Sequence, residues 1–195
     1  MPRTSSPARR ALPKQVRIIG GTWKRTLLPV ADRPGLRPTP DRVRETLFNW
    51  LGQDLSGWRC VDAFAGTGAL GLEAASRGAA DVLLVESEAV LVEQLRAIVE
   101  RLAAEQVRVQ RGNALSVLAS LPAASVDLVF LDPPFESGLF DQALGAARRA
   151  LAATGFVYLE APTQWGGEAL AAHGLELVRH MKAGAVHGHL LRPVA

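Results

Sequence analysis

The sequence is nearly free of cysteine and has no long apolar run. Its only cysteine, Cys60, lies in the apolar stretch RCVDAF. A single thiol excludes an internal disulfide and a cluster of metal-bound thiolates, so Cys60 is predicted to be a small core residue. No stretch of about 18 uncharged apolar residues occurs, which argues against a membrane span. The first 15 residues also lack the apolar centre of a secretory signal, so a cytoplasmic location is expected.

The sign of the charge changes along the chain. Residues 1–59 contain 12 Lys and Arg against 4 Asp and Glu, whereas residues 60–195 contain 10 against 15. A basic front of this kind is either a solvated tail or a surface that meets phosphate. The 195 residues, 48% of them hydrophobic, are enough for one globular domain with a small appendage.

The front of the chain predicts a tail, a hairpin and a helix. Residues 1–14 mix Pro, Ser and Arg without an apolar period, so we expect a disordered basic tail. Two β-prone runs within residues 16–30, around Gly20 and Gly21, predict a hairpin. A helix is predicted from Thr39, with Thr39 as its cap and Pro40 at its first position. Residues 15–58 thus form a small N-terminal extension.

From residue 59 to the C-terminus, short apolar runs alternate with helical patterns. Strands are predicted at residues 60–64, 81–86, 107–110, 126–131 and 155–160. The segments between them have helical spacing, and the last of these helical patterns ends at residue 153. Continuous apolar strands separated by helices indicate a parallel sheet that is covered on both faces. Two extended runs around Ala183 and Gly184 predict an antiparallel hairpin at the sheet edge.

A glycine loop follows the first of these strands. GTGALG, from Gly66 to Gly71, fits the pattern G-x-G-x-x-G between a strand and a helix, and Glu86 ends the next strand 20 residues further on. Gly66 and Gly68 permit a sharp turn and close approach of a ligand, while Glu86 can accept hydrogen bonds from ribose hydroxyls. The pattern therefore predicts a cofactor that contains a nucleoside. It does not choose between NAD and S-adenosylmethionine.

The segment LDPPFESG after the fourth strand favours methyl transfer to an amine. Asp132 and the carbonyl of Pro133 can each accept a hydrogen bond from an exocyclic amino group, which keeps its lone pair directed at the methyl donor. The rings of Pro133 and Pro134 hold this backbone rigid. Phe135 offers a flat face on which a base can stack. We therefore predict Asp132, Pro133, Pro134 and Phe135 as the catalytic group.

These motifs resemble a known family. DPPF together with VDAFAGTGALGLEAASRGA is similar to the amino-group methyltransferases that use S-adenosylmethionine. RIIGGTWKRTLLPV, RPTPDRVRETLFNWL and KAGAVHGHLL further resemble the bacterial enzymes that methylate the 2-amino group of a guanine in small-subunit (16S) ribosomal RNA. The resemblance implies a Rossmann-like, doubly wound α/β fold with a seven-stranded, mostly parallel sheet and an antiparallel last strand.

The resemblance also implies roles for individual residues. The cofactor would lie against Asp62, Phe64, Gly66, Gly68, Glu86, Asn113 and Ala114, where Asn113 replaces the more usual acid and gives weaker charge assistance. The extension at residues 15–58 would face the RNA, with Lys24, Arg25, Arg37 and Arg42 as substrate contacts. The partner would be small-subunit ribosomal RNA or the small subunit itself. We expect the protein to be a monomer and to have no membrane partner.

Three other functions remain open from the residues alone. The acid-Pro-Pro-aromatic motif also serves N6-adenine methyltransferases, the glycine loop also serves NAD-dependent oxidoreductases, and an RNA-binding assembly factor could retain the fold without the chemistry. His187 and His189 have a spacing compatible with a metal, but the sequence shows no third ligand. We therefore predict no metal site there.

Overall fold

The computed structural model describes residues 15–31 and 38–194. The predicted tail at residues 1–14 and the candidate Arg37 lie outside these ranges. The strands are β1 (Gln15–Arg17), β2 (Leu27–Pro29), β3 (Arg59–Asp62), β4 (Asp81–Glu86), β5 (Val107–Arg111), β6 (Val126–Leu131), β7 (Leu151–Ala161), β8 (Leu175–Ala183) and β9 (Val186–Pro193). The helices are α1 (Asp41–Leu51), α2 (Ala69–Ser76), α3 (Ala89–Arg101), α4 (Ala114–Ser120), α5 (Phe140–Ala150) and α6 (Gly167–Ala171).

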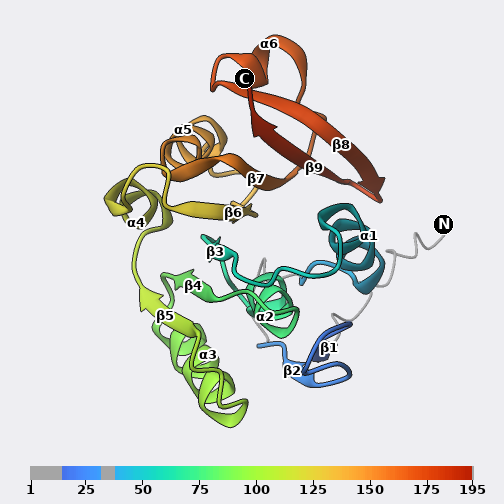
Figure 1. Ribbon diagram of the computed structural model, residues 1–195, viewed down its shortest axis with the longest axis vertical. Coiled ribbons are helices and arrows are strands. Elements are labelled where there is room, and N and C mark those ends of the chain that lie inside the picture. Colours follow the sequence, from blue (N-terminus) through green and yellow to red (C-terminus); the bar gives the residue numbers. More distant parts are fainter. Residues whose placement is uncertain (1–14, 32–37, 195) are drawn as a thin grey trace, which may run out of the picture.

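A seven-stranded sheet in the order β5-β4-β3-β6-β7-β9-β8 forms the centre of the fold (Figure 1). The first five strands in this order are parallel, and β9 pairs antiparallel with both β7 and β8. The doubly wound fold, the antiparallel last strand and the hairpin at residues 175–193 are therefore confirmed. We call the edge where the five parallel strands end the carboxyl edge, and the edge where they begin the amino edge.

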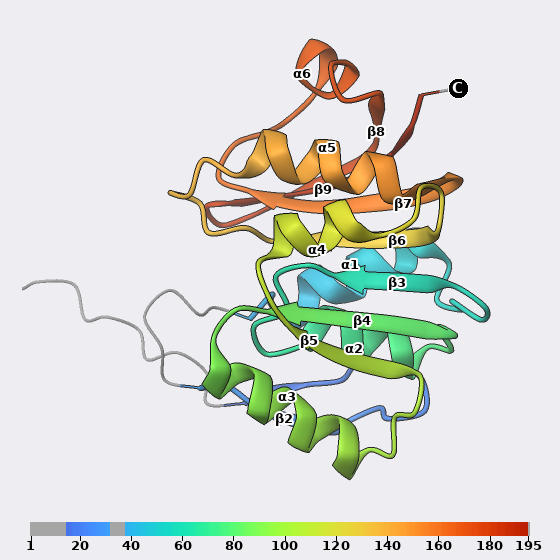
Figure 2. The same ribbon diagram turned by 90° about the vertical axis from the view of Figure 1, so that its left-hand side faces the viewer.

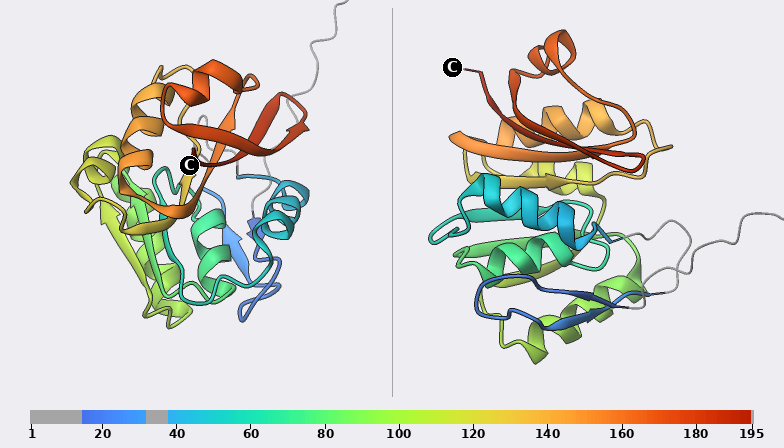
Figure 3. Two further views of the ribbon diagram at one scale, coloured as in Figure 1. Left: turned by 45° about the horizontal axis from the view of Figure 1, so that its top comes forward. Right: turned by 90° about the vertical axis from the view of Figure 1, so that its right-hand side faces the viewer.

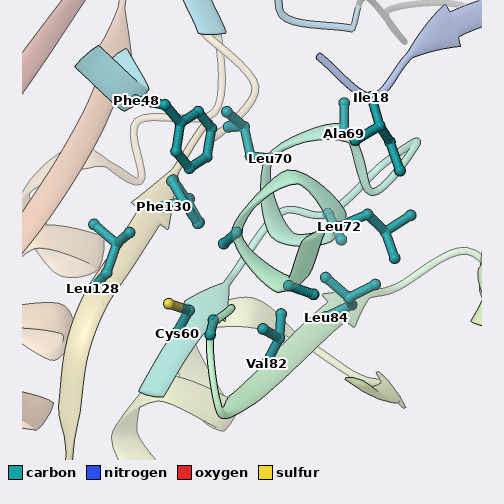
Figure 4. Packing of buried hydrophobic residues seen from close by; sticks show 14 of the residues in the cluster. Ile18, Phe48, Cys60, Ala69, Leu70, Leu72, Val82, Leu84, Leu128 and Phe130 are labelled. Carbon is teal, nitrogen blue, oxygen red and sulfur yellow. The ribbon is translucent and has the colours of Figure 1, made fainter. Parts of the chain in front are cut away.

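Helices cover both faces of the sheet. Helices α1, α2 and α3 pack on one face and α4 and α5 on the other, so the strands are buried on both sides (Figures 1 and 2). The aromatic ring of Phe48, from α1, lies 6.3 Å from that of Phe130, from β6. Figure 4 shows these two rings beside Leu70 and above Cys60, which is buried as predicted. No helix among the described residues is long and apolar enough to cross a membrane.

Two local predictions were wrong. Helix α1 begins at Asp41 after Pro40 and has no side-chain cap, because the hydroxyl of Thr39 donates its hydrogen bond to Glu160 instead. Residues 151–153, predicted to continue a helix, belong to β7, because Leu151 pairs with Val126 at the start of β6. In both places a contact distant in sequence overrides the local preference.

A buried arginine fixes the N-terminal extension to the domain. Arg44 is fully buried in α1. Its guanidinium donates to the carbonyls of Thr39 and Arg17, at 3.0 and 2.9 Å, and to the carboxylates of Asp41 and Glu73, at 2.6 and 3.2 Å. Burial lowers the pKa of Arg44, while the two carboxylates raise it. The basic front is therefore held by an internal charge network that the sequence pattern did not reveal.

Glu73 in α2 is the acid at the centre of this network. It is fully buried and accepts from the backbone N–H groups of Ile19 and Gly20, both at 2.8 Å, and from the guanidinium of Arg77 at 2.9 Å. The motif RIIGG is thus bound through its backbone by a carboxylate of α2. Arg77 in turn lies 4.7 Å above the ring of Phe48, within the range of a cation–π contact.

Candidate active site

Three carboxyl side chains meet at the carboxyl edge. Asp62 ends β3, Asp132 follows β6, and Glu160 is next to last in β7. Leu131 pairs with Leu159 in parallel register, so the residues that follow, Asp132 and Glu160, stand side by side. Side chains alternate between the two faces of a sheet along a strand. Asp132 therefore points to the same face as Phe130, two residues before it, and Glu160 to the same face as Tyr158, two residues before it. The sequence predicted Asp132 and Asp62 for this site but missed Glu160.

All three acids have raised pKa values, mainly because they are buried. Burial raises the pKa of Asp132 well above its usual range, and the neighbouring Glu160 and Asp62 raise it further. The pKa of Asp62 rises to about 7, mainly through burial, although the N–H of Gly71 donates to its Oδ2 at 2.9 Å. Among the described residues, no Lys or Arg pairs with any of the three. The site therefore favours a ligand that brings positive charge.

Glu160 is held by two hydroxyl groups. The hydroxyls of Thr39 and Tyr158 both donate to its Oε1, at 2.7 and 3.1 Å. Burial raises the pKa of Glu160, and these two hydrogen bonds lower it. The pKa of Tyr158 is raised well above its usual value by burial and by Glu160, so Tyr158 remains a neutral donor. The only sequence signal for Glu160 was an acid at the end of an apolar strand.

The glycine loop makes the turn that the sequence predicted. Gly66 and Gly68 have φ values of 51° and 76°, in the left-handed region that glycine adopts without strain. A Cβ on Gly71 would lie 2.2 Å from Cδ2 of Leu84, so this glycine lets α2 pack closely on the sheet. Phe64, in the same segment, is partly buried against the face covered by α4 and α5. The loop thus presents backbone at the carboxyl edge.

Glu86 joins the loop after β4 to the glycine loop. Its Oε2 accepts from the N–H of Gly66 at 3.0 Å, and its Oε1 accepts from the N–H groups of Ser87 and Glu88 at 2.7 and 2.9 Å. The carboxylate is therefore oriented at the predicted nucleoside position. A carboxylate oxygen has more than one acceptor direction, so these bonds leave room for ribose hydroxyls.

Asn113, which is predicted to lie by the adenine, has a structural role in the fold. It is the N-cap of α4, and its Oδ1 accepts from the N–H of Ser116 at 3.0 Å. Ala114, the first residue of the helix, is buried. Both residues follow β5 at the carboxyl edge, two strands from β3. The amide that would meet the adenine is thus fixed by the helix it caps.

Phe135 is the exposed end of a row of aromatic rings. Its side chain is 37% exposed, and its ring lies 6.5 Å from that of Phe140, which lies 6.0 Å from that of Trp165. Pro133 is buried and Pro134 exposed, and the carbonyl of Pro134 accepts from the N–H of Ser137. The carbonyl of Pro133 makes no hydrogen bond to any described residue, so it is available as an acceptor.

The predicted RNA contacts fall at opposite edges of the sheet. Arg42, in the first turn of α1, is exposed and lies at the carboxyl edge, three residues after Thr39. Lys24 and Arg25 lie in the turn between β1 and β2, which the N–H of Thr22 ties to the carbonyl of Ser76 at the end of α2. Figures 2 and 3 show this blue turn at the amino edge, away from the segment that follows β6. Lys24 and Arg25 therefore do not join Asp132.

Three histidines cluster on β8 and β9. Nitrogen atoms of His180, His187 and His189 lie within 4.8 Å of one another, so the structure adds a third member that the sequence did not show. However, Nδ1 of His189 lies 3.1 Å from the carbonyl of Leu159, and Nε2 accepts from the N–H of Trp165 at 3.0 Å. With both nitrogens engaged, His189 supports the chain at Trp165 and has no lone pair free for a metal.

Comparison with known proteins agrees with this geometry. Residues 16–192 match the family described as Conserved hypothetical protein 95. The chain is 46% identical to the ribosomal RNA small subunit methyltransferase D of Escherichia coli strain K12, over 78% of this chain and 77% of that protein. The protein of the same name from Haemophilus influenzae is 44% identical, over 67% and 69% of the two chains. A solved structure, a putative methyltransferase from Escherichia coli, matches with a TM-score of 0.79 and 41% identity, over 93% of this chain and 99% of the other. The chain therefore belongs to the family of the ribosomal RNA small subunit methyltransferase D proteins, as its front motifs and DPPF predicted.

Proposed function

We propose that this protein transfers a methyl group from S-adenosylmethionine to the 2-amino group of a guanine in small-subunit ribosomal RNA. The observation that carries the proposal is the position of DPPF: Asp132 follows the strand next to the one that leads into the glycine loop. The membership of the methyltransferase D family supports the RNA substrate.

The residues present fit this cofactor. S-adenosylmethionine, when bound, supplies a methyl group made electrophilic by its sulfonium, and it also carries an ammonium group. Asp62, Asp132 and Glu160 have no cationic side chain paired with them in the described part of the chain, so a cationic ligand relieves their mutual repulsion. Gly66 and Gly68 would hold the methionine part by their backbone, and Glu86 the ribose.

Asp132 and Pro133 act on the acceptor amine. The lone pair of an exocyclic amine is delocalised into the ring, which makes it a weak nucleophile. When the carboxylate of Asp132 and the carbonyl of Pro133 each accept one N–H of the amine, the lone pair is directed away from both, toward the methyl donor. The methylated nitrogen is strongly acidic and loses its proton readily, so alignment and electrostatics provide most of the rate.

The carboxyl edge is also where the RNA would be held. Phe135 stacks on the target base, since it is the one large exposed aromatic side chain among the described residues. Arg42 lies at the same edge and suits a backbone phosphate or the carboxylate of the cofactor. Residues 15–58 form the extension that approaches RNA through this edge, while residues 59–195 form the catalytic domain, which acts as a monomer in the cytoplasm.

Transfer of labelled methyl tests the proposal. The protein is incubated with labelled S-adenosylmethionine and either naked small-subunit RNA or assembled small subunits, and the product is digested to nucleosides. We expect N2-methylguanosine at one position in at least one of the two substrates. Label in N6-methyladenosine would overturn the choice of base, and absence of label in both substrates would overturn the proposed activity. Sedimentation of the free protein tests the monomer.

A further inference from the structure

Guanine carries two neighbouring hydrogen-bond donors at the edge that would be methylated. Its 2-amino group lies next to N1–H, so both neighbouring positions offer hydrogen to the protein. In adenine the amino group lies next to an N1 that carries a lone pair. An enzyme that places Asp132 on the amine can therefore recognise guanine by placing a second acceptor on N1–H.

Glu160 is in position to be that second acceptor. It stands beside Asp132 through the register of β6 and β7, and on the same face of the sheet. Its side chain is 5% exposed, and both of its hydrogen bonds, from Thr39 and Tyr158, go to Oε1. Oε2 has no hydrogen bond to another described residue. Within the described ranges, Oε2 therefore keeps its acceptor positions for a ligand.

The two hydroxyl groups fix the chemical character of Glu160. Both donate to the carboxylate, which stabilises its ionised form, whereas Asp132 accepts no hydrogen bond from any described residue. These two hydrogen bonds therefore favour the ionised form of Glu160. An ionised Glu160 presents a pure acceptor at Oε2, which attracts N1–H and repels the lone pair of an adenine N1.

From this arrangement we propose that Glu160 is a specificity-determining residue whose Oε2 accepts the N1–H of the target guanine. The inference rests on the proposed function, because it assigns a role to Glu160 in the recognition of the same base. It also explains why a second acid stands beside Asp132, where it costs electrostatic energy in the free protein. The wild-type enzyme is expected to reject a base that has the 2-amino group without N1–H.

A comparison of two bases and two proteins isolates the contact. The mapped target guanine is replaced by 2-aminopurine, which keeps the 2-amino group but has a lone pair at N1 and lacks O6. Glu160→Gln keeps the shape of the side chain. Its carbonyl oxygen can accept from Thr39 and Tyr158, which turns the NH₂ group toward the position of Oε2. The effect of the missing O6 cancels in the cycle unless it depends on Glu160.

We expect the wild-type enzyme to prefer guanine over 2-aminopurine by at least about 100-fold in kcat/KM. Glu160→Gln should lose about 100-fold on guanine and little on 2-aminopurine, so the preference falls below about 10-fold. Glu168→Gln, an exposed acid of α6, is the matched control. Thermal melting checks that the variant is folded.

Two results would overturn the inference. A wild-type enzyme that uses 2-aminopurine as well as guanine does not read N1–H at all. A preference unchanged in both Glu160→Gln and the shorter Glu160→Asp assigns that reading to another group, such as Asp132. If the wild-type enzyme places no methyl on guanine N2, the proposed function itself is wrong. This result differs from both results above, so a failure of the proposed function can be told from a failure of the role of Glu160.

Discussion

The hydroxyl of Thr39 donates a 2.7 Å hydrogen bond to Glu160 across 121 positions of sequence. This bond connects the residues just before α1, Pro38–Pro40, to the acid pair at the carboxyl edge. The carbonyl of the same residue accepts from the buried Arg44, so Thr39 is held from two sides. The N-terminal extension therefore helps to build the site from within, in addition to any contact it makes with RNA.

Replacement of Thr39 by Val should weaken both stability and selectivity. The variant keeps the shape of the side chain but leaves the buried Glu160 with one donor, and a lost hydrogen bond of this kind costs about 1 to 3 kcal/mol. Chemical unfolding measures this cost. Thr46→Val is the matched control, because Thr46 donates to the carbonyl of Arg42 on the exposed side of the helix. If the two variants lost equal stability, the hydrogen bond from Thr39 to Glu160 would not have the predicted importance.

Replacement of Asp132 by Ala should abolish most transfer while the cofactor still binds. One preorganised polar group at a reacting centre contributes about 10²- to 10³-fold to kcat. The removal of a like charge also relieves Asp62 and Glu160, so the free protein should be at least as stable as the wild type. Single-turnover transfer and calorimetry with S-adenosylmethionine measure the two effects. Undiminished turnover would refute the role of Asp132.

The sequence predicted the sheet well because its strands are buried on both faces. In Val126–Leu131, for example, every residue except Asp127 is apolar and buried, and that pattern needs no knowledge of its neighbours. The glycine loop and DPPF were equally visible, because their chemistry depends on residues adjacent in sequence. Such features can be predicted from a local pattern.

Glu160 and Arg44 could not be predicted in this way. A glutamate at the end of a strand is usually a solvated terminus, and it becomes part of the site only because Leu159 pairs with Leu131. Arg44 is charged and belongs to a helix whose partners, Glu73 and the carbonyl of Arg17, come from distant segments. Their roles depend on strand register and tertiary contact, which the local pattern does not contain.

The pKa of Asp62 predicts a stability that depends on pH. Its folded value of about 7 lies above the value of about 4 expected in the unfolded chain. Between these values the folded state binds more protons, so this residue lowers stability as the pH rises from 4 to 7. Asp62→Asn can still accept from Gly71 and should be more stable than the wild type at pH 7.5 by about 2 to 4 kcal/mol, at about 1.4 kcal/mol for each pH unit of the shift.

Urea unfolding at several pH values checks this expectation. The two proteins should have similar stability near pH 4 and diverge above it. Asp132 and Glu160 have raised pKa values as well, so some slope should persist in the variant. Glu105→Gln, at an exposed acid, should leave the slope as it is. Parallel curves for Asp62→Asn and the wild type would contradict the raised pKa.

Replacement of the buried Arg44 should strongly destabilise the folded protein. Arg44→Met keeps the length of the side chain but leaves Glu73 buried with only Arg77 as a charged partner, and removal of one member of a buried ion pair costs about 3 to 5 kcal/mol. Arg96→Met breaks an exposed pair with Glu93 and should cost no more than about 1 kcal/mol. Unfolding in urea compares the two. Similar small losses would show that the network is dispensable.

The arrangement of basic residues predicts which of them RNA contacts. If the substrate lies across the carboxyl edge, Arg42→Ala should weaken binding to the methylated RNA or subunit several-fold. It should also reduce by about 1 the slope of log affinity against log salt, as expected for a lost phosphate contact. Lys24→Ala removes the same charge at the amino edge. It should change the affinity and the salt slope less, because the turn that contains Lys24 is bound to Ser76, away from DPPF. Filter binding at several salt concentrations measures both variants, with unfolding curves to show that neither is destabilised. A larger effect for Lys24 than for Arg42 would mean that RNA wraps around the hairpin to the far edge, and the proposed path of the substrate would have to be redrawn.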